Sequence, residues 1–137
     1  MTQFNNKRSV AILGYQIVLV CYKRNKWLDD KALKVLVKAA ETVAKNHDVI
    51  IIKAQHDTVQ KDHVHIAINA NVTTNLVKFI NSLKSCSSRM LKDINDQFKW
   101  SSGYFISSYE TCDEQIVEDY IQDNGRESHQ AKYTHSK

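Results

Sequence analysis

The sequence contains few cysteines, and none of them lies in a recognisable motif. Cys21, Cys86 and Cys112 are the only three, they are far apart, and no two form a C-x-x-C pair. An odd number at such spacings argues against both a disulfide framework and a zinc knuckle. We therefore expect the protein to work in a reducing compartment, the cytoplasm.

Long hydrophobic runs are also missing. No apolar stretch approaches the roughly 18 residues that a membrane-spanning helix needs, and the N-terminus shows no signal-peptide pattern. The sequence therefore predicts a soluble, intracellular protein that has no membrane as a partner.

The overall composition is that of an ordinary globular domain. The 137 residues are 42% hydrophobic and 25% charged, close to the average for soluble proteins, and they are enough to bury one core without disulfides. We expect a single domain over residues 1–125. Periodic apolar positions stop beyond it, which predicts a flexible polar tail over residues 126–137.

The charge is moderately positive. A formal net charge of +4 and a pI near 8.9 are compatible with a polyanionic partner but indicate it weakly. Basic side chains flank the first predicted strand, with Lys7 and Arg8 before it and Lys23, Arg24 and Lys26 after it. These clusters are candidates for phosphate contacts, or they are simply the solvated ends of a strand.

Hydrophobic periodicity predicts strands at 9–22, 49–55, 63–70 and 100–108, and helices at 29–46, after residue 71, and near the C-terminus. A Thr111-Cys112-Asp113-Glu114 capping box and Gly125 mark the two ends of the last helix. This order predicts an α+β fold, a split β-α-β unit of the ferredoxin-like or RRM-like kind. We expect an antiparallel sheet with helices on one face, leaving the other face as a shallow, partly open platform.

The most informative stretch is the third predicted strand. Aliphatic Val64, Ile66 and Ile68 alternate with His63 and His65, so the two histidines share the face opposite the core. Side chains two apart on a strand are about 7 Å apart at Cα, which lets two imidazoles reach one cation. The pair is half of a metal site with open positions, or two histidines on a polar face by chance.

The last helix offers a second group of reactive side chains. Tyr120 and Asn124 are four residues apart and therefore lie on one helical face. A phenol, an amide and two imidazoles around one cation would suit phosphodiester cleavage, with the phenolate attacking phosphorus. The alternative is that Tyr120 packs against the sheet with its aliphatic neighbours while Asn124 caps the helix end.

Several ordered segments together resemble one known family. From Tyr15 to Asn124 the chain is similar to the small single-tyrosine HUH transposases (TnpA-like) of bacterial and archaeal insertion sequences. The matching segments are YQIVLVCYKR at 15–24, DHVHI at 62–66, LKSCSS at 83–88, WSSGYF at 100–105 and YIQDN at 120–124.

The resemblance implies a complete function. It implies a homodimer with composite active sites that acts on single-stranded DNA hairpins at transposon ends. Tyr120 would be the nucleophile of a 5′-phosphotyrosyl intermediate, and His63, His65 and Asn124 would bind Mg²⁺ or Mn²⁺. Residues 1–125 would then form one HUH transposase domain carrying the catalytic tyrosine on its C-terminal helix.

Lys23, Arg24 and Lys84 are the candidate DNA contacts within the matching segments. The sequence also departs from the family at four places. Asn124 stands where glutamine is usual, Gln16 where histidine is common, and Lys61 where proline is usual. The glycine expected before the last helix is absent around Ser108 and Tyr109.

Two other functions remain compatible with these residues. A replication-initiator-type nickase shares the histidines and the tyrosine but usually carries a larger chain. A domesticated, non-catalytic protein that binds single strands or hairpins could use the same sheet, with basic and aromatic side chains making the contacts.

Overall fold

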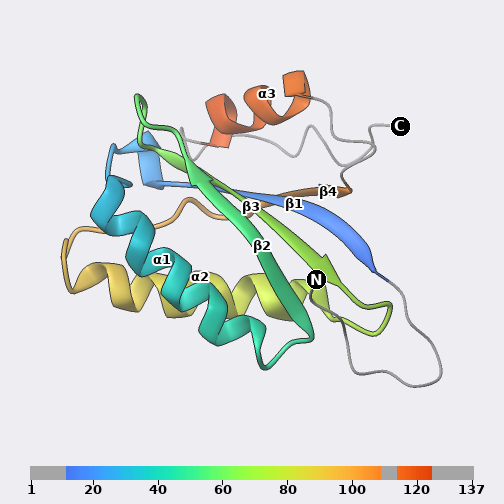
Figure 1. Ribbon diagram of the computed structural model, residues 1–137. Helices are drawn as coiled ribbons and strands as arrows, with labels where there is room; N and C mark the ends of the chain where they lie inside the picture. Colours follow the sequence, from blue (N-terminus) through green and yellow to red (C-terminus); the bar gives the residue numbers. More distant parts are fainter. Residues whose placement is uncertain (1–11, 109–113, 125–137) are drawn as a thin grey trace.

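A computed structural model describes residues 12–108 and 114–124 of the chain (Figure 1). Four strands form one antiparallel sheet in the order β2-β3-β1-β4, which confirms the predicted α+β, split β-α-β architecture. The elements are β1 (Leu13–Val20), the 3-10 turn η1 (Tyr22–Arg24), α1 (Asp30–Ala44), β2 (Val49–His56), β3 (His63–Ala70), α2 (Leu76–Lys92), β4 (Phe105–Ser108) and α3 (Glu114–Asn124).

Strand β1 is central because it is apolar on both faces. It pairs with β3 on one side and β4 on the other, and its residues from Ile17 to Val20 are all buried. Ile17 and Leu19 point into the main core, whereas Val18 and Val20 point to the opposite face. An unbroken apolar run of this kind is typical of a strand covered on both sides.

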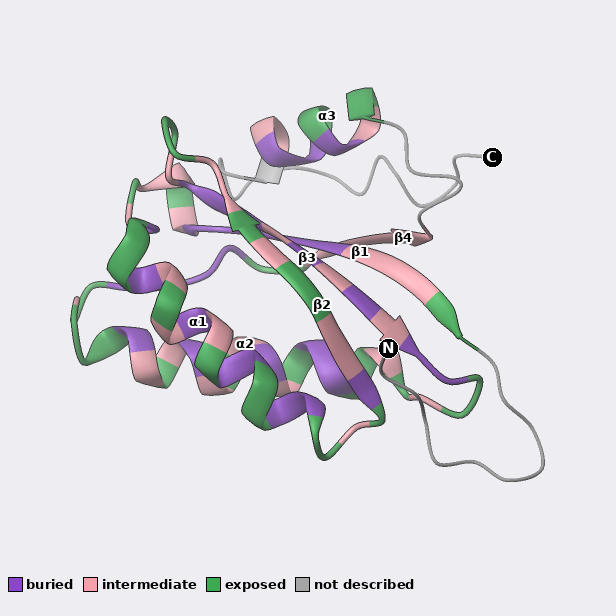
Figure 2. Ribbon diagram, in the orientation of Figure 1, coloured by how far each residue is buried: buried purple, intermediate pink, exposed green. Residues whose placement is uncertain are grey.

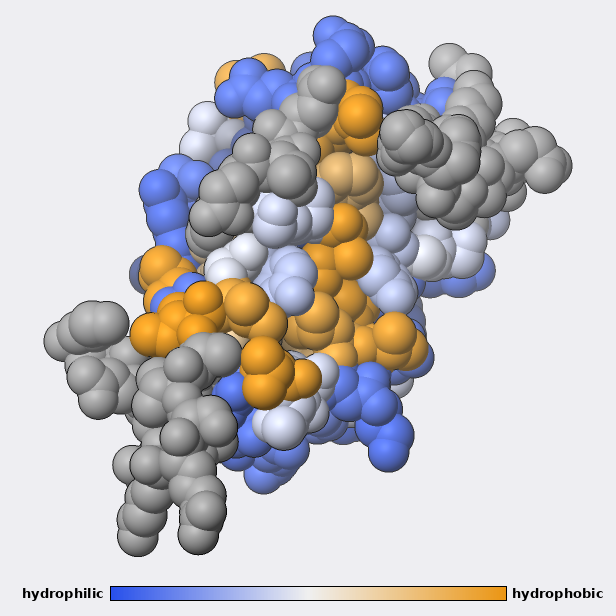
Figure 3. Space-filling model, turned by 90° about the vertical axis from the view of Figure 1, so that its right-hand side faces the viewer, coloured by the Kyte–Doolittle hydropathy of each residue, from blue (hydrophilic) through white to orange (hydrophobic). Residues whose placement is uncertain are grey.

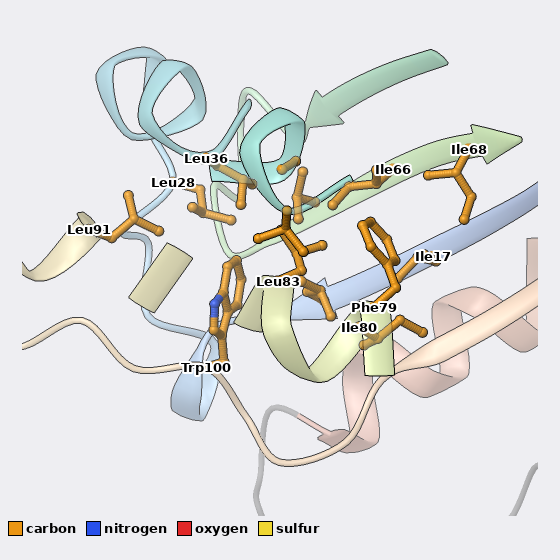
Figure 4. Close-up of a cluster of buried hydrophobic side chains, with 14 of the residues drawn as sticks. Ile17, Leu28, Leu36, Ile66, Ile68, Phe79, Ile80, Leu83, Leu91 and Trp100 are labelled. Atoms are coloured by element: carbon orange, nitrogen blue, oxygen red, sulfur yellow. The ribbon is translucent and has the colours of Figure 1, made fainter. Parts of the chain in front are cut away.

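Helices α1 and α2 lie side by side over one face of the sheet (Figures 1 and 4). Between them and the sheet lies the main hydrophobic core. Its largest fully buried side chains include Phe79, Ile80 and Leu83 of α2, Leu36 of α1, and Ile66 and Ile68 of β3.

Helix α3 lies over the other face of the sheet (Figure 1). Its buried residues Val117, Tyr120 and Ile121 pack on Val18 and Val20 of β1, with Phe105 of β4 at the margin. Figure 2 shows that α3 buries the side turned to the sheet and exposes the other. α3 therefore covers part of the second face, where the sequence predicted a shallow, partly open platform.

Two predicted strands are shorter than expected, for local reasons. The first stops at Val20 because Lys23 and Arg24 turn the chain with φ values of 53° and 56°. The fourth begins at Phe105 rather than at residue 100, because Gly103 bends the chain with φ of 82°. Trp100 contributes only an isolated bridge to Cys21.

Some exposed side chains are apolar. Near the start of β1 and of α2 they are Ile12, Leu13, Val72 and Val77, and Figure 3 shows apolar surface on the side of the molecule that it presents.

No helix in the described part of the chain is long and apolar enough to cross a membrane. The capping box at 111–114 is described only from Glu114 onward, and Gly125 and the tail lie outside the described residues.

Candidate functional site

His63 and His65 lie together on the face of the sheet that carries α3. Their ring centroids are 5.1 Å apart, at an interplanar angle of 77°, while Val64 and Ile66 between and beyond them point into the main core. The predicted shared face is thus present. His63 is 7% exposed, and His65 is half-buried.

The ring of His63 is oriented by the residue before it. His63 Nδ1 donates to Asp62 Oδ1 over 2.7 Å, which leaves Nε2 as the nitrogen that faces away from the carboxylate. Asp62 is 1% exposed, and Arg24 Nε donates to its other oxygen over 2.9 Å. Burial alone would raise the pKa of the Asp62 carboxyl, but the bonds from His63 and Arg24 outweigh it and hold that pKa below its usual value.

The ring of His65 is oriented from β1. Gln16 Nε2 lies 2.7 Å from His65 Nδ1, across the pairing of β1 with β3. The pKa of His65 is lowered, first by burial of the imidazole and then by the neighbouring His63, with a smaller opposite effect of Asp57 and Glu118. The ring is therefore held in its neutral form, the form that can bind a cation.

A β-bulge in the edge strand β2 brings a further polar residue to this face. The register with β3 shifts between Ile51 and Lys53, which reverses the side-chain alternation beyond it. Gln55 consequently stands opposite His65 instead of pointing into the core.

Between this face and α3 lies a cavity of about 590 Å³. The sheet side contributes both histidines, Gln16, Gln55 and the following Asp57; α3 contributes Glu114, Val117, Glu118 and Ile121. The cavity is polar, carries carboxylates and imidazoles, and is large enough for a nucleotide-sized group.

Tyr120 lies on the side of α3 that faces the sheet, but it is not among the residues that line this cavity. Its side chain is 5% exposed, and its ring packs 5.7 Å from that of Phe105. Its hydroxyl lies 3.7 Å from where a Cβ on Gly103 would be. The packing alternative considered for Tyr120 is thus realised in this arrangement, although with Val117 and Ile121 as its helical neighbours.

The third expected ligand, Asn124, ends α3, and its side chain lies outside the described part of the structure. Among the described residues, no three His, Cys, Asp or Glu side chains converge on one point that could hold a metal ion. Of the expected ligands, the described side chains are therefore His63 and His65, and the whole ligand set remains a prediction.

The three candidate DNA contacts have different surroundings. Lys23 is exposed, with its ammonium 5.4 Å from the ring centroid of Tyr22. Arg24 is engaged by Asp62 and by Gln122, whose Oε1 accepts from the guanidinium over 2.9 Å. Lys84 Nζ donates to the backbone carbonyls of Ser101 and Gly103.

Sequence reasoning did not foresee several residues of this site. Gln55 and Asp57 reach it through a bulge, which no motif indicated. The Arg24–Gln122 contact joins residues 98 apart in the chain, so local periodicity carried no signal for it. Asp62 lies within the DHVHI segment at 62–66, and its position directly before His63 was the sequence signal that could have identified it as a residue of this site.

Comparison with known proteins adds a family and a fold. The sequence matches the family described as "Transposase IS200 like" over residues 9–124, whereas a comparison with curated proteins finds no match.

Two solved structures are similar. One is a protein assigned as a transposase from Deinococcus radiodurans R1, with a TM-score of 0.76 and 17% identity, covering 90% of this chain and 98% of the other. The second is a REP-associated tyrosine transposase bound to a REP hairpin, with a TM-score of 0.55 and 13% identity, covering 90% and 72%. At these identities the likeness shows the fold.

Proposed function

Because the chain belongs to the family of IS200-like transposases, we propose that it cleaves and rejoins single-stranded DNA at hairpin-bearing transposon ends through a 5′-phosphotyrosyl intermediate. The observation that carries the proposal is the histidine pair on the sheet face against which the tyrosine-bearing helix packs. The hairpin bound to the similar REP-associated transposase supports the choice of substrate.

We propose that these side chains hold a divalent cation, Mg²⁺ or Mn²⁺. Asp62 holds the proton of His63 on Nδ1, which leaves Nε2 as a ligand in a carboxylate–histidine pair that is common at metal sites. A cation held there would polarise the scissile phosphodiester and stabilise the charge that develops on it.

For His65 also to bind the cation through Nε2, the proton of its neutral ring must lie on Nδ1. The side-chain oxygen of Gln16 would then accept the hydrogen bond from Nδ1. Turning that amide by half a turn achieves this without moving the ring. We propose Asn124, the last residue of α3, as the third protein ligand.

Tyr120 is the proposed nucleophile. Its hydroxyl oxygen attacks phosphorus, the bond to the 3′ oxygen breaks, and a free 3′-OH leaves while the 5′ phosphate remains on the phenol. The phosphotyrosyl bond then conserves the energy needed for rejoining to another 3′-OH. Since Tyr120 does not line the histidine cavity of its own chain, the attack requires that α3 moves, or that α3 comes from a second subunit.

We propose the second arrangement, a homodimer with composite active sites. Residues 109–113 are the only link between β4 and α3, and α3 rests on a small apolar cluster. Few constraints therefore tie the helix to one particular sheet. Exposed apolar side chains at the start of β1 and α2 are a surface suited to protein contact.

The test uses labelled single-stranded DNA from the ends of the element that flanks the gene, with Mn²⁺. Wild type should form an adduct that survives denaturation. Tyr120→Phe should form none while still binding the hairpin, because only the nucleophilic oxygen is removed. Tyr104→Phe, in a tyrosine packed against the main core, is the matched control and should retain the adduct.

The histidine pair is tested in the same assay. His63→Ala and His65→Ala should each stop cleavage and leave hairpin binding, whereas His47→Ala, in the turn after α1, should cleave normally. Adduct formation by Tyr120→Phe, or cleavage that resists a chelator, would disprove the mechanism. Hairpin binding without any wild-type adduct would instead favour the non-catalytic binding protein.

A further inference from the structure

One side chain connects the histidine pair to the helix that carries Tyr120. Arg24 Nε donates to Asp62 Oδ2 over 2.9 Å, and a terminal nitrogen of the same guanidinium donates to Gln122 Oε1 over 2.9 Å. We propose that Arg24 is a positioning residue with two separable contacts: the Asp62 contact orients the histidine pair, and the Gln122 contact holds α3 on the sheet face that carries the histidines.

The Asp62 contact is buried and ionic. Asp62 is almost completely removed from solvent, whereas the Arg24 side chain is 29% exposed. The carboxylate accepts from His63 on one oxygen and from Arg24 on the other. A carboxylate fixed on both sides cannot rotate, so Arg24 determines the direction in which Asp62 points the imidazole of His63.

The Gln122 contact fixes the rotation of α3. Gln122 is two residues beyond Tyr120 and follows Ile121, one of the few apolar side chains by which α3 packs on the sheet. Its amide nitrogen also donates to Glu118 Oε2, one turn earlier. Apolar packing permits a helix to roll or slide, whereas a directed bond from a charged donor to one side chain does not.

The backbone at Arg24 suits this role. Lys23 and Arg24 both have left-handed φ values, 53° and 56°, which cost free energy in residues other than glycine. The turn is closed by Arg24 N donating to Cys21 O and by the Asn25 side chain donating to Tyr22 O. The strained turn directs the guanidinium back across the end of the sheet, toward Asp62 and α3.

The two contacts can be separated by substitution because arginine and lysine differ in shape. A guanidinium is a planar fork that serves two acceptors at once, whereas an ammonium is a single point charge. Arg24→Lys can keep the ion pair with buried Asp62 but cannot also reach Gln122. Gln122→Ala removes the second contact and leaves Asp62 paired.

The experiment measures two quantities in protein without DNA. The first is hydrogen exchange of the α3 amides, which reports how firmly the helix is docked. The second is Mn²⁺ binding by calorimetry. Gln115→Ala is the matched control, because Gln115 also bonds a carboxylate one turn away on α3, Asp119. The omission of DNA ensures that a lost phosphate contact cannot produce the effect.

We expect Gln122→Ala to raise α3 exchange by about five- to tenfold, within the range of an ordinary hydrogen bond, because the contact is partly exposed to solvent. Mn²⁺ affinity should change to the same degree in Gln122→Ala and in Arg24→Lys, because both loosen the helix that ends in Asn124 while Asp62 keeps its partner. Gln115→Ala should change neither by more than about twofold. Arg24→Lys should reproduce both results of Gln122→Ala, and Arg24→Ala, if it folds, should also weaken Mn²⁺ binding.

The proposal is overturned if Gln122→Ala and Gln115→Ala exchange alike, or if Arg24→Lys leaves α3 exchange unchanged. It is also overturned if Arg24→Lys weakens Mn²⁺ binding more than Gln122→Ala does. The Mn²⁺ measurement rests on the proposed metal site. If wild type binds no Mn²⁺, the metal proposal fails, while the α3 exchange still decides whether Arg24 holds the helix.

Discussion

At the scale of single residues, the site is defined by what holds each histidine rather than by the histidines alone. His63 is oriented by Asp62, and His65 by Gln16. The sequence could predict that the histidines share a face, because strand alternation is a local property. It could not predict the Arg24–Gln122 bond, because that contact exists only once α3 is docked.

The lowered pKa of His65 predicts a pH effect on stability. Burial and the neighbouring His63 keep the ring neutral in the folded chain, so on acidification the unfolded chain takes up the proton first. The stability that the neutral His65 contributes is fully present above its pKa in the unfolded chain, about 6.5. That stability is lost as the pH falls toward the lower pKa of His65 in the folded chain.

We expect the urea concentration at the unfolding midpoint, measured with a chelator present, to decrease as the pH is lowered from 7.5 to 5.5. The fall should be smaller in His65→Gln, which has no imidazole to protonate. An equal fall in both proteins would assign the effect to other groups.

At the scale of elements, the types and order of helices and strands were predictable, because each has a clear period. Their ends and irregularities were not. The register of β2 shifts between Ile51 and Lys53. β4 starts late because of the bend at Gly103, whose carbonyl, with that of Ser101, accepts from the Lys84 ammonium. The serine-rich part of α2 does not interrupt that helix, because Ser87 has a partner inside the core.

Ser87 joins α2 to the segment before β4 and should matter for stability. It is fully buried, donates to Leu83 O and accepts from Trp100 Nε1 over 3.0 Å. Ser87→Ala would leave the buried indole N–H without this acceptor, which should lower the free energy of unfolding by about 1–3 kcal/mol.

The measurement is urea denaturation, with a shifted midpoint at unchanged slope. Ser85→Ala, at an exposed position two residues earlier, should change stability little. Equal effects of the two substitutions would mean that the Trp100 bond contributes nothing.

At the scale of the whole molecule, the main question is whether α3 packs on the sheet of its own subunit or on that of a second subunit. In the described chain, α3 packs on its own sheet and Tyr120 is buried beside Phe105. A composite dimer therefore requires α3 to leave this position, and the small apolar cluster beneath it makes that exchange feasible. The family and fold followed from the sequence, but the docking of α3 could not, because the same apolar face fits either subunit.

Mixing two inactive variants tests the composite site. In a mixed dimer of Tyr120→Phe with His63→Ala, a shared arrangement leaves one site that has both the tyrosine and the histidines. Random subunit exchange should restore about a quarter of wild-type cleavage, since about half the dimers are mixed and each has one competent site. No recovery, with exchange shown independently by differently tagged subunits, would mean that each subunit uses its own tyrosine.

The central place of β1 also sets the order in which the chain can fold during synthesis. β1 is synthesised before its partners β3 and β4, which begin at His63 and Phe105. An almost wholly apolar strand is therefore unpaired while the chain up to its partners is synthesised. Pairings this distant in sequence form slowly, and exposed apolar strands invite aggregation. The β2-β3 hairpin and α1 can form earlier from neighbouring residues, and β1 can join β3 before β4 closes the other edge. A ribosome that stalls before β3 would therefore hold a nascent chain with both sides of β1 open, and chaperone demand should be greatest at that length.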